Sequence, residues 1–302
     1  MATDTSETAS EPTEGLFELD HRSVDRWLRR GLYGTSVVLL VFLWIPLVVM
    51  IVLSFAANSS TLFPFRGWTL AHYAATFVDA ELMGSLWTSV QIATIAASIA
   101  TVFGVLASFA LARYAFPLKE LFRTFGVLPM VVPGVVLGIA LLIYFRSLLS
   151  VLPVVGDIFV PGFWTVVLTH SVYGLPFVLL IVTARMYTFD DTLEEAARDL
   201  GADPITTFRD VTLPIMAPAI AAGFLFAWIR SFEDFIRVWF VKGVFDVLTT
   251  SMFGMIKHGA APKMNAISSA IVVTIAVALA VAMNVGNVTG YVAGTYGDED
   301  EE

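Results

Sequence analysis

Two adjacent acids at the edge of an apolar run are the residues of this chain whose type and position most directly predict binding chemistry. Glu233 and Asp234 follow the uncharged segment 211–229. An ionisable side chain within or at the end of a membrane span is costly, and by default it indicates a functional site. If both carboxylates line a cavity, they suit a polycation, which they would hold by several weak charge-assisted contacts that still permit passage.

A local pairing is the alternative interpretation of these acids. Arg230 lies four residues before Asp234, and Arg237 lies four residues after Glu233. Opposite charges at this spacing meet on one face of a helix and neutralise each other. The sequence alone favours neither interpretation.

Aromatic residues surround the acid pair. Trp228 and Phe232 precede it, and Trp239 follows it. Their ring faces could contact an amine by cation-π attraction. An aromatic belt at the membrane interface explains the same residues equally well.

Catalytic and metal sites are not indicated. The chain contains no cysteine, which rules out disulfides, thiolate zinc sites and cysteine nucleophiles. Its four histidines are scattered, and His170 is more typical of polar packing than of a proton relay; they are His21, His72, His170 and His258. An intramembrane enzyme would need a polar constellation inside the spans, so we expect no catalytic residue, metal or cofactor.

The elements that must position the acids are membrane helices. Of the 302 residues, 57% are hydrophobic and 14% are charged, and the mean hydropathy is +0.80. Crossing the hydrocarbon takes about 20 apolar residues. The sequence therefore predicts an all-α integral membrane protein with six transmembrane helices, at 31–65, 82–112, 124–145, 158–184, 211–229 and 264–297.

The charges outside the spans predict an orientation. Basic residues near the spans are more numerous on one side, which places both termini in the cytoplasm of a multi-pass plasma-membrane protein. The net charge of −9 comes largely from acidic tails at 1–30 and 298–302, on either side of a transmembrane domain at 31–297. Acidic tails do not suit nucleic acid, so the partners we expect are the lipid bilayer and other proteins.

The predicted cytoplasmic loop at about 190–213 contains helix-capping residues that a simple connector would not need. Thr192 and Glu195 have the spacing of a capping box at the start of a short helix. Gly201 suits the left-handed residue that ends this helix. Asp203 and Pro204 then suit the N-cap and first residue of a second helix.

This loop resembles the signature of inner-membrane permeases of binding-protein-dependent ABC importers. The family pattern is E-A-A, three residues, G, nine residues, then I-x-L-P. Valine replaces isoleucine here, and the matching residues are Glu195, Ala196, Ala197, Gly201, Val211, Leu213 and Pro214. The resemblance implies a type I permease bundle whose coupling helix docks on a separate ATPase.

The resemblance also implies partners and a class of substrate. Segments Glu195–Gly201, Ser231–Asp234 and Pro262–Ala266 look most like the second permease subunit of spermidine/putrescine importers. Expected partners are an ATPase dimer, a second permease and an extracellular solute-binding protein. None of the lysines follows a glycine in a phosphate-loop pattern, so the chain itself is not expected to be an enzyme. Ferric iron or thiamine stays open as a substrate, and a stand-alone channel or an intramembrane enzyme is the alternative class.

Overall fold

The computed structural model describes residues 21–57, 67–151, 159–257 and 261–292, and within these ranges the chain is helical apart from turns and a single bridge between Ala56 and Trp68. Residues 1–20 of the predicted N-terminal tail, the predicted C-terminal tail and parts of three loops lie outside the described residues. The helices are α1 (His21–Ser54), α2 (Ala71–Phe77), α3 (Ala80–Arg113), α4 (Lys119–Val131), α5 (Gly134–Val151), α6 (Phe163–Tyr187), α7 (Thr192–Asp199), α8 (Pro204–Thr207), α9 (Leu213–Phe232), α10 (Ile236–Val241), α11 (Leu248–Lys257) and α12 (Ala261–Val292), and a π-helical segment at Phe208–Thr212 joins α8 to α9.

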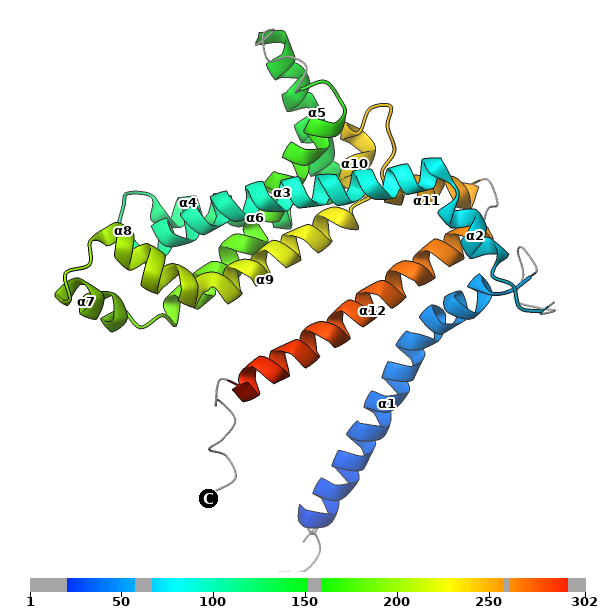
Figure 1. Cartoon of the computed structure of the whole chain (residues 1–302), viewed down its shortest axis with the longest axis horizontal. Helices are drawn as coiled ribbons and strands as arrows, with labels where there is room; N and C mark the ends of the chain where they lie inside the picture. The colour runs from blue at the N-terminus through cyan, green and yellow to red at the C-terminus, as the bar shows by residue number, and fades with distance from the viewer. Residues whose placement is uncertain (1–20, 58–66, 152–158, 258–260, 293–302) are drawn as a thin grey trace, which may run out of the picture.

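Three long helices, α3, α6 and α9, pack together as the centre of the bundle (Figure 1). Small residues let their backbones approach closely. In a membrane the lipid tails are as apolar as the side chains, so helices associate through close packing rather than through the hydrophobic effect. Val178 of α6 lies between two glycines: a Cβ on Gly104 of α3 would lie 2.7 Å from its Cβ, and one on Gly223 of α9 would lie 3.3 Å from its Cα. The three backbones are therefore held at a separation that glycine alone permits.

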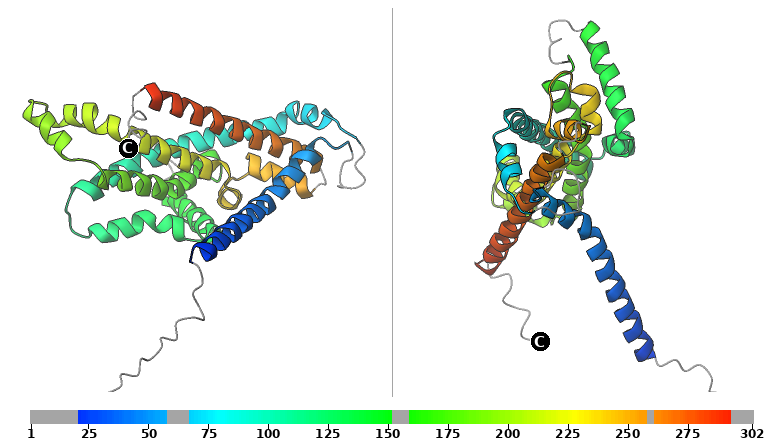
Figure 2. Two further views of the ribbon diagram at one scale, coloured as in Figure 1. Left: turned by 90° about the horizontal axis from the view of Figure 1, so that it is seen from below. Right: turned by 90° about the vertical axis from the view of Figure 1, so that its right-hand side faces the viewer.

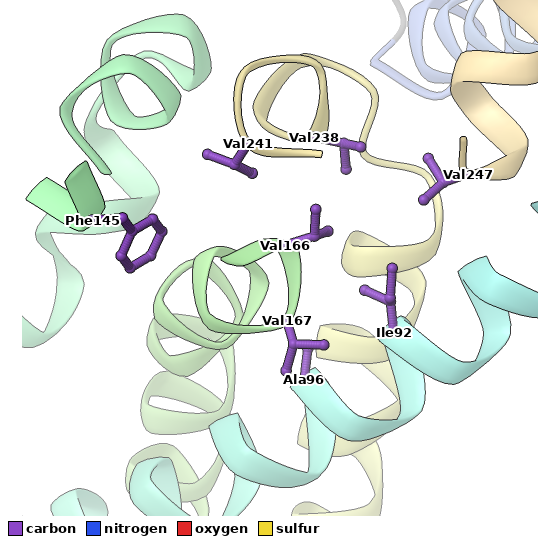
Figure 3. Packing of buried hydrophobic residues seen from close by; sticks show 8 residues of the cluster. All are labelled: Ile92, Ala96, Phe145, Val166, Val167, Val238, Val241 and Val247. Atoms are coloured by element: carbon purple, nitrogen blue, oxygen red, sulfur yellow. The ribbon is translucent and has the colours of Figure 1, made fainter. Parts of the chain in front are cut away.

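A second cluster of buried residues packs neighbouring helices around the N-terminal half of α6. Val166 and Val167 of α6 lie between Ile92 of α3, Phe145 of α5 and Val238 of α10 (Figure 3). All five side chains are almost fully buried. This cluster holds α10, which directly follows the two acids in sequence, against α6.

The span count differs in part from the sequence prediction. Four helical stretches are long and apolar enough to cross a membrane, and a bent pair raises the count to five; the four are Leu28–Ser54, Ala80–Arg113, Phe163–Tyr187 and Pro204–Phe232. The apolar part of α12 within the described side chains, Pro262–Val277, is shorter than a full span. Six spans therefore stays a prediction.

The predicted third span, 124–145, is not one straight helix. It divides into α4 and α5, and the chain bends by 109° between them. Val132 has extended backbone angles, φ −66° and ψ 131°. The cause is Pro133, because a proline ring disfavours a helical conformation in the residue before it.

The first predicted span also has different bounds. Helix α1 begins at His21, within the segment assigned to the tail, and it ends at Ser54 rather than at residue 65. It diverges from the central bundle and lies beside α12 at one end (Figure 2). Within its most apolar stretch, none of the residues is buried by the rest of the chain.

Candidate functional site

The cytoplasmic loop folds as the two short helices that the sequence predicts, but the cap of the first differs. Thr192 is the first residue of α7 rather than its N-cap, so the predicted capping box with Glu195 is wrong. The N-cap is Asp191, whose side chain makes no capping bond. Asp190, one residue earlier, instead fixes the start of the helix: its Oδ1 accepts hydrogen bonds from Thr192 N at 3.0 Å and from Thr192 Oγ1 at 2.7 Å. These bonds favour the charged form, so the pKa of Asp190 is lowered.

The end of α7 and the start of α8 are as predicted. Gly201 has a φ of +89°, the left-handed conformation that ends a helix. Ala202 N donates to Ala197 O at 3.0 Å. Asp203 then caps α8 by accepting from Ile205 N at 2.8 Å and Thr206 N at 3.1 Å, and these bonds lower the pKa of Asp203.

The predicted coupling residues divide into an exposed tip and the base of α9. Glu195, Ala196 and Gly201 are exposed, and the side chains of two apolar neighbours are strongly so: Leu200 at 90% and Ile205 at 78%. Leu213 and Pro214 instead form the first turn of α9. The loop thus carries an apolar and acidic surface at one end of the bundle, far from α2 and α11 (Figure 1).

A polar cluster behind this surface was not predicted. The Arg113 guanidinium, at the end of α3, bonds Asp191 and also Glu194, with Nη2 3.0 Å from Oε1. Thr212 Oγ1 donates to the same Oε1 at 2.6 Å. Glu194 therefore connects α7 with the end of α3 and with the π-helical segment before α9.

At the opposite end of α9 the two acids have separate surroundings. Asp234 is buried, with its Oδ1 3.1 Å from Arg237 Nη1 and its Oδ2 3.3 Å from His170 Nε2. Glu233 pairs with Arg230, and its side chain is 50% exposed. Local pairing is confirmed but with exchanged partners: instead of Arg230 with Asp234 and Glu233 with Arg237, each arginine pairs with the acid three residues away, Arg230 with Glu233 and Arg237 with Asp234.

The buried acid belongs to a network that crosses from α9 to α6. His170 Nδ1 lies 2.6 Å from Ser231 Oγ. The Arg237 guanidinium carbon lies 3.4 Å from the centre of the Tyr173 ring, and Arg230 donates to the Tyr173 hydroxyl. Asp234 is thus paired locally, and its partners are Arg237 and His170.

The exposed acid borders an apolar cavity of ≈ 580 Å³ between α3, α9, α11 and α12. Trp228 and Phe232 line it, with their rings stacked at a centroid distance of 5.1 Å and an interplanar angle of 8°. Leu86 of α3 and Ile271 of α12 form part of the facing wall. Of the predicted pathway residues, Glu233, Trp228 and Phe232 share this cavity, and Asp234 does not line it.

Comparison with known proteins agrees with this architecture. Residues 100–291 match the family described as the binding-protein-dependent transport system inner membrane component. The chain belongs to this family. It is an inner-membrane permease of an ABC importer and a multi-pass protein of the plasma membrane.

Curated relatives of the permease carry polyamine names. It is 33% identical to the spermidine/putrescine transport system permease protein PotC of Escherichia coli strain K12, over 82% of this chain and 89% of the relative. It is 32% identical to PotC of Haemophilus influenzae, over 77% of this chain and 87% of the relative. It is also 32% identical to the putrescine transport system permease protein PotI of E. coli K12, over 76% of this chain and 82% of the relative.

Solved structures show the same fold. A chain of a bacterial ABC transporter that imports the acidic polysaccharide alginate superposes with a TM-score of 0.65 at 13% identity, covering 89% of the permease and 99% of that chain. The same kind of transporter with an alginate pentasaccharide-bound periplasmic protein gives 0.62 at 17% identity, with 87% and 94% coverage. At such low identity the likeness concerns the fold alone.

Metal chemistry has no candidate in the part of the permease that the structure describes. No group of three or more histidine, aspartate or glutamate side chains there has the geometry of a metal site.

The cluster of Glu194, Arg113 and Thr212 is the feature beside the candidate site that sequence reasoning missed. No rule of spacing connects Arg113 with Glu194, because 81 residues separate them in the chain.

Proposed function

We propose that the permease forms half of the translocation pathway of a polyamine importer and is driven by a separate ATPase that docks on α7. The observation that carries this proposal is the exposed surface of Glu195, Ala196 and Leu200 at the end of the bundle. The hydrogen bonds from Thr192 to Asp190 define where α7 begins, and the left-handed Gly201 defines where it ends. A helix held in this way can pass on a displacement instead of fraying.

The docking surface has the chemistry of a protein interface. Leu200 and Ile205 supply apolar anchors, and Glu195 supplies a charge that a basic residue can pair at the rim. Asp199 lies on the same short helix. We infer that each permease of the importer presents one such helix, so that a pair of permeases engages an ATPase dimer.

The substrate proposal rests on Glu233 and on the names of the relatives. A half-exposed carboxylate beside stacked Trp228 and Phe232 can hold an ammonium group by charge and by cation-π attraction. Arg230 already pairs with Glu233, so a substrate amine would compete for a shared carboxylate and bind loosely. Loose binding suits transit, because a pathway must release what it takes up.

The remaining partners follow from the importer type. A second permease completes the pathway, and a solute-binding protein delivers the polyamine at the end of the bundle that carries α2 and α11. Both termini then lie on the cytoplasmic side with α7. A transporter that shares this fold has been solved in complex with a periplasmic protein, and we infer that this importer uses such a protein too.

Cross-linking tests the docking. Because the chain contains no cysteine, Ala196→Cys gives a single reactive thiol on the exposed face of α7. In the assembled importer we expect it to cross-link to a cysteine in the ATPase, whereas Leu118→Cys, 73% exposed in the loop between α3 and α4, serves as the control. An Ala196→Cys chain that transports but never cross-links more than the control would sink the proposal.

Uptake tests the substrate. Proteoliposomes that contain the whole importer and its binding protein should take up labelled spermidine in an ATP-dependent manner. Unlabelled putrescine should compete, and thiamine or ferric iron should not. Competition by thiamine or iron, with none by putrescine, would overturn the polyamine assignment while leaving the docking proposal intact.

A further inference from the structure

Polar contacts join α7 to two spanning helices at one carboxylate. Glu194 Oε1 is 3.0 Å from Arg113 Nη2, at the end of α3, and accepts a hydrogen bond from Thr212 Oγ1 at 2.6 Å, just before α9. Arg113 also bonds Asp191, so it holds the first turn of α7 at two points. These residues are not part of the exposed surface that docks the ATPase.

The contacts that Glu194 makes are shielded from solvent, whereas the Asp191 side chain is 68% exposed. The Glu194 side chain is 12% exposed, that of Arg113 is 24% exposed, and Thr212 is 1% exposed. Partial burial strengthens an ion pair relative to one in water. The planar guanidinium can contact two carboxylates together, which a lysine ammonium does less well.

Helix α7 has little other attachment to the bundle. None of its residues is buried. A cavity of ≈ 360 Å³ lies behind it, and Phe109, Arg113, Glu194, Phe208 and Thr212 are among the residues that line this space. A displacement of α7 therefore reaches the spans mainly through the polar contacts and the chain itself.

The two helices that receive these contacts also form the cavity at the other end of the bundle. Helix α3 contributes Leu86 and Val90 to the wall, and α9 contributes Trp228 and Phe232 beside Glu233. A joint movement of α3 and α9 would keep their shared side of the cavity intact while shifting it against α11 and α12, which form the rest of the wall. A movement of one helix alone would pull that side apart.

We propose that Glu194 is a positioning residue that links α7 to α3 through Arg113 and to α9 through Thr212, so that both helices follow α7 during the ATPase cycle. The inference rests on the proposed docking of α7 on the ATPase. It assigns to the partly buried Glu194 a role separate from that of its exposed neighbour Glu195.

The first test is Glu194→Gln in the reconstituted importer. Glutamine keeps the size and an acceptor for Thr212 but removes the charge that pairs with Arg113. We expect ATP hydrolysis to persist while the number of substrate molecules moved per ATP falls about fivefold or more, within the range of measured coupling energies. Arg113→Lys, which keeps the charge, should recover part of the ratio that Arg113→Gln loses.

A control variant lies on the same helix. Arg198 Nη2 is 3.4 Å from Glu194 Oε2, but Arg198 is 57% exposed and reaches neither α3 nor α9. Arg198→Gln should therefore keep the wild-type transport ratio. The double variant Arg113→Gln with Glu194→Gln should lose less than the sum of the two single losses, because the two residues share one contact. It can still lose more than Glu194→Gln alone, because Arg113 also bonds Asp191.

The Ala196→Cys cross-link separates this inference from the proposed function. If Glu194→Gln cross-links normally and keeps the wild-type ratio, the inference is overturned and the docking stands. If Glu194→Gln alone abolishes the cross-link, Glu194 serves only to fold α7, and the inference is likewise overturned. If the cross-link fails even with Glu194 and Arg113 intact, the docking itself is wrong.

Discussion

Glu233 and Asp234 are neighbours in the chain, yet their side chains have different surroundings. Asp234 is enclosed by His170 and Arg237 between α6, α9 and α10, and Glu233 borders the apolar cavity. Helix α9 ends at Phe232, so the two residues lie in the turn before α10 and point in different directions. Asp234 is thus placed to hold the fold, and Glu233 is the acid that we propose meets a substrate.

Single substitutions should separate these two roles. Asp234→Ala leaves Arg237 buried without its carboxylate, and removing one partner of a buried ion pair costs about 3–5 kcal/mol. We expect less assembled importer and a lower melting temperature. Glu233→Gln should assemble normally and slow spermidine uptake, measured per assembled complex. Equal losses of stability in both variants would contradict the division.

Gly201 permits a second test at the residue scale. A side chain there would meet no atom within 4 Å, so any effect comes from its φ of +89° rather than from a clash. A β-branched residue in this left-handed conformation costs about 1–2 kcal/mol. Gly201→Val should therefore reduce uptake and ATPase stimulation while insertion stays normal, and Gly201→Asn, which tolerates this conformation, should be milder. Equal activity of Gly201→Val and the wild type would remove the requirement for this cap.

At the scale of elements, the separation of α3, α6 and α9 depends on glycines that face Val178. Gly104 and Gly223 contact this one valine from two sides. The bend between α4 and α5 likewise depends on a single proline and on the fit of Gly138, where a Cβ would come within 2.9 Å of Phe240 in α10. The first feature fixes α3 and α9, which line the cavity beside Glu233, and the second fixes α5 against α10.

Two alanine substitutions on α3 should have opposite effects. Gly104→Ala forces α3 away from Val178, and such overpacking costs about 1–3 kcal/mol. Gly84→Ala meets no atom within 4 Å and should stabilise the helix by about 0.5–1 kcal/mol. Thermal denaturation in detergent measures both, and Val178→Ala should restore part of the stability that Gly104→Ala loses. A neutral Gly104→Ala would mean that α3 and α6 are not held at this contact.

On the scale of the whole molecule, the two ends of the bundle have distinct chemistry. One end carries α7 and the polar cluster around Glu194, and the other carries α2, α11 and the turn with the two acids (Figure 1). Helices α3 and α9 run between them. If the ATPase docks on α7 as we propose, this arrangement would carry its movement to the cavity beside Glu233.

Labelling with an impermeant maleimide tests this polarity. Leu200, 90% exposed beside α7, and Leu70, 67% exposed beside α2, are well suited to single cysteines in a chain that has none of its own. In intact cells Leu70→Cys should react and Leu200→Cys should not. In inverted vesicles from cells without the ATPase, which would otherwise cover Leu200, the result should reverse. Reaction of both from one side would contradict the proposed orientation.

The sequence by itself determined what depends on neighbouring residues. The apolar runs predicted a helical membrane protein, and the E-A-A pattern located the loop that we propose couples to the ATPase. Gly201 and Asp203 marked helix ends, because a cap is decided by the few residues around it. Only the tertiary structure decided that Glu194 meets Arg113 and Thr212, that Asp234 meets His170, and that the third span bends by 109°. These contacts join segments far apart in the chain, and the direction of a side chain at a helix end is set by the helices packed against it.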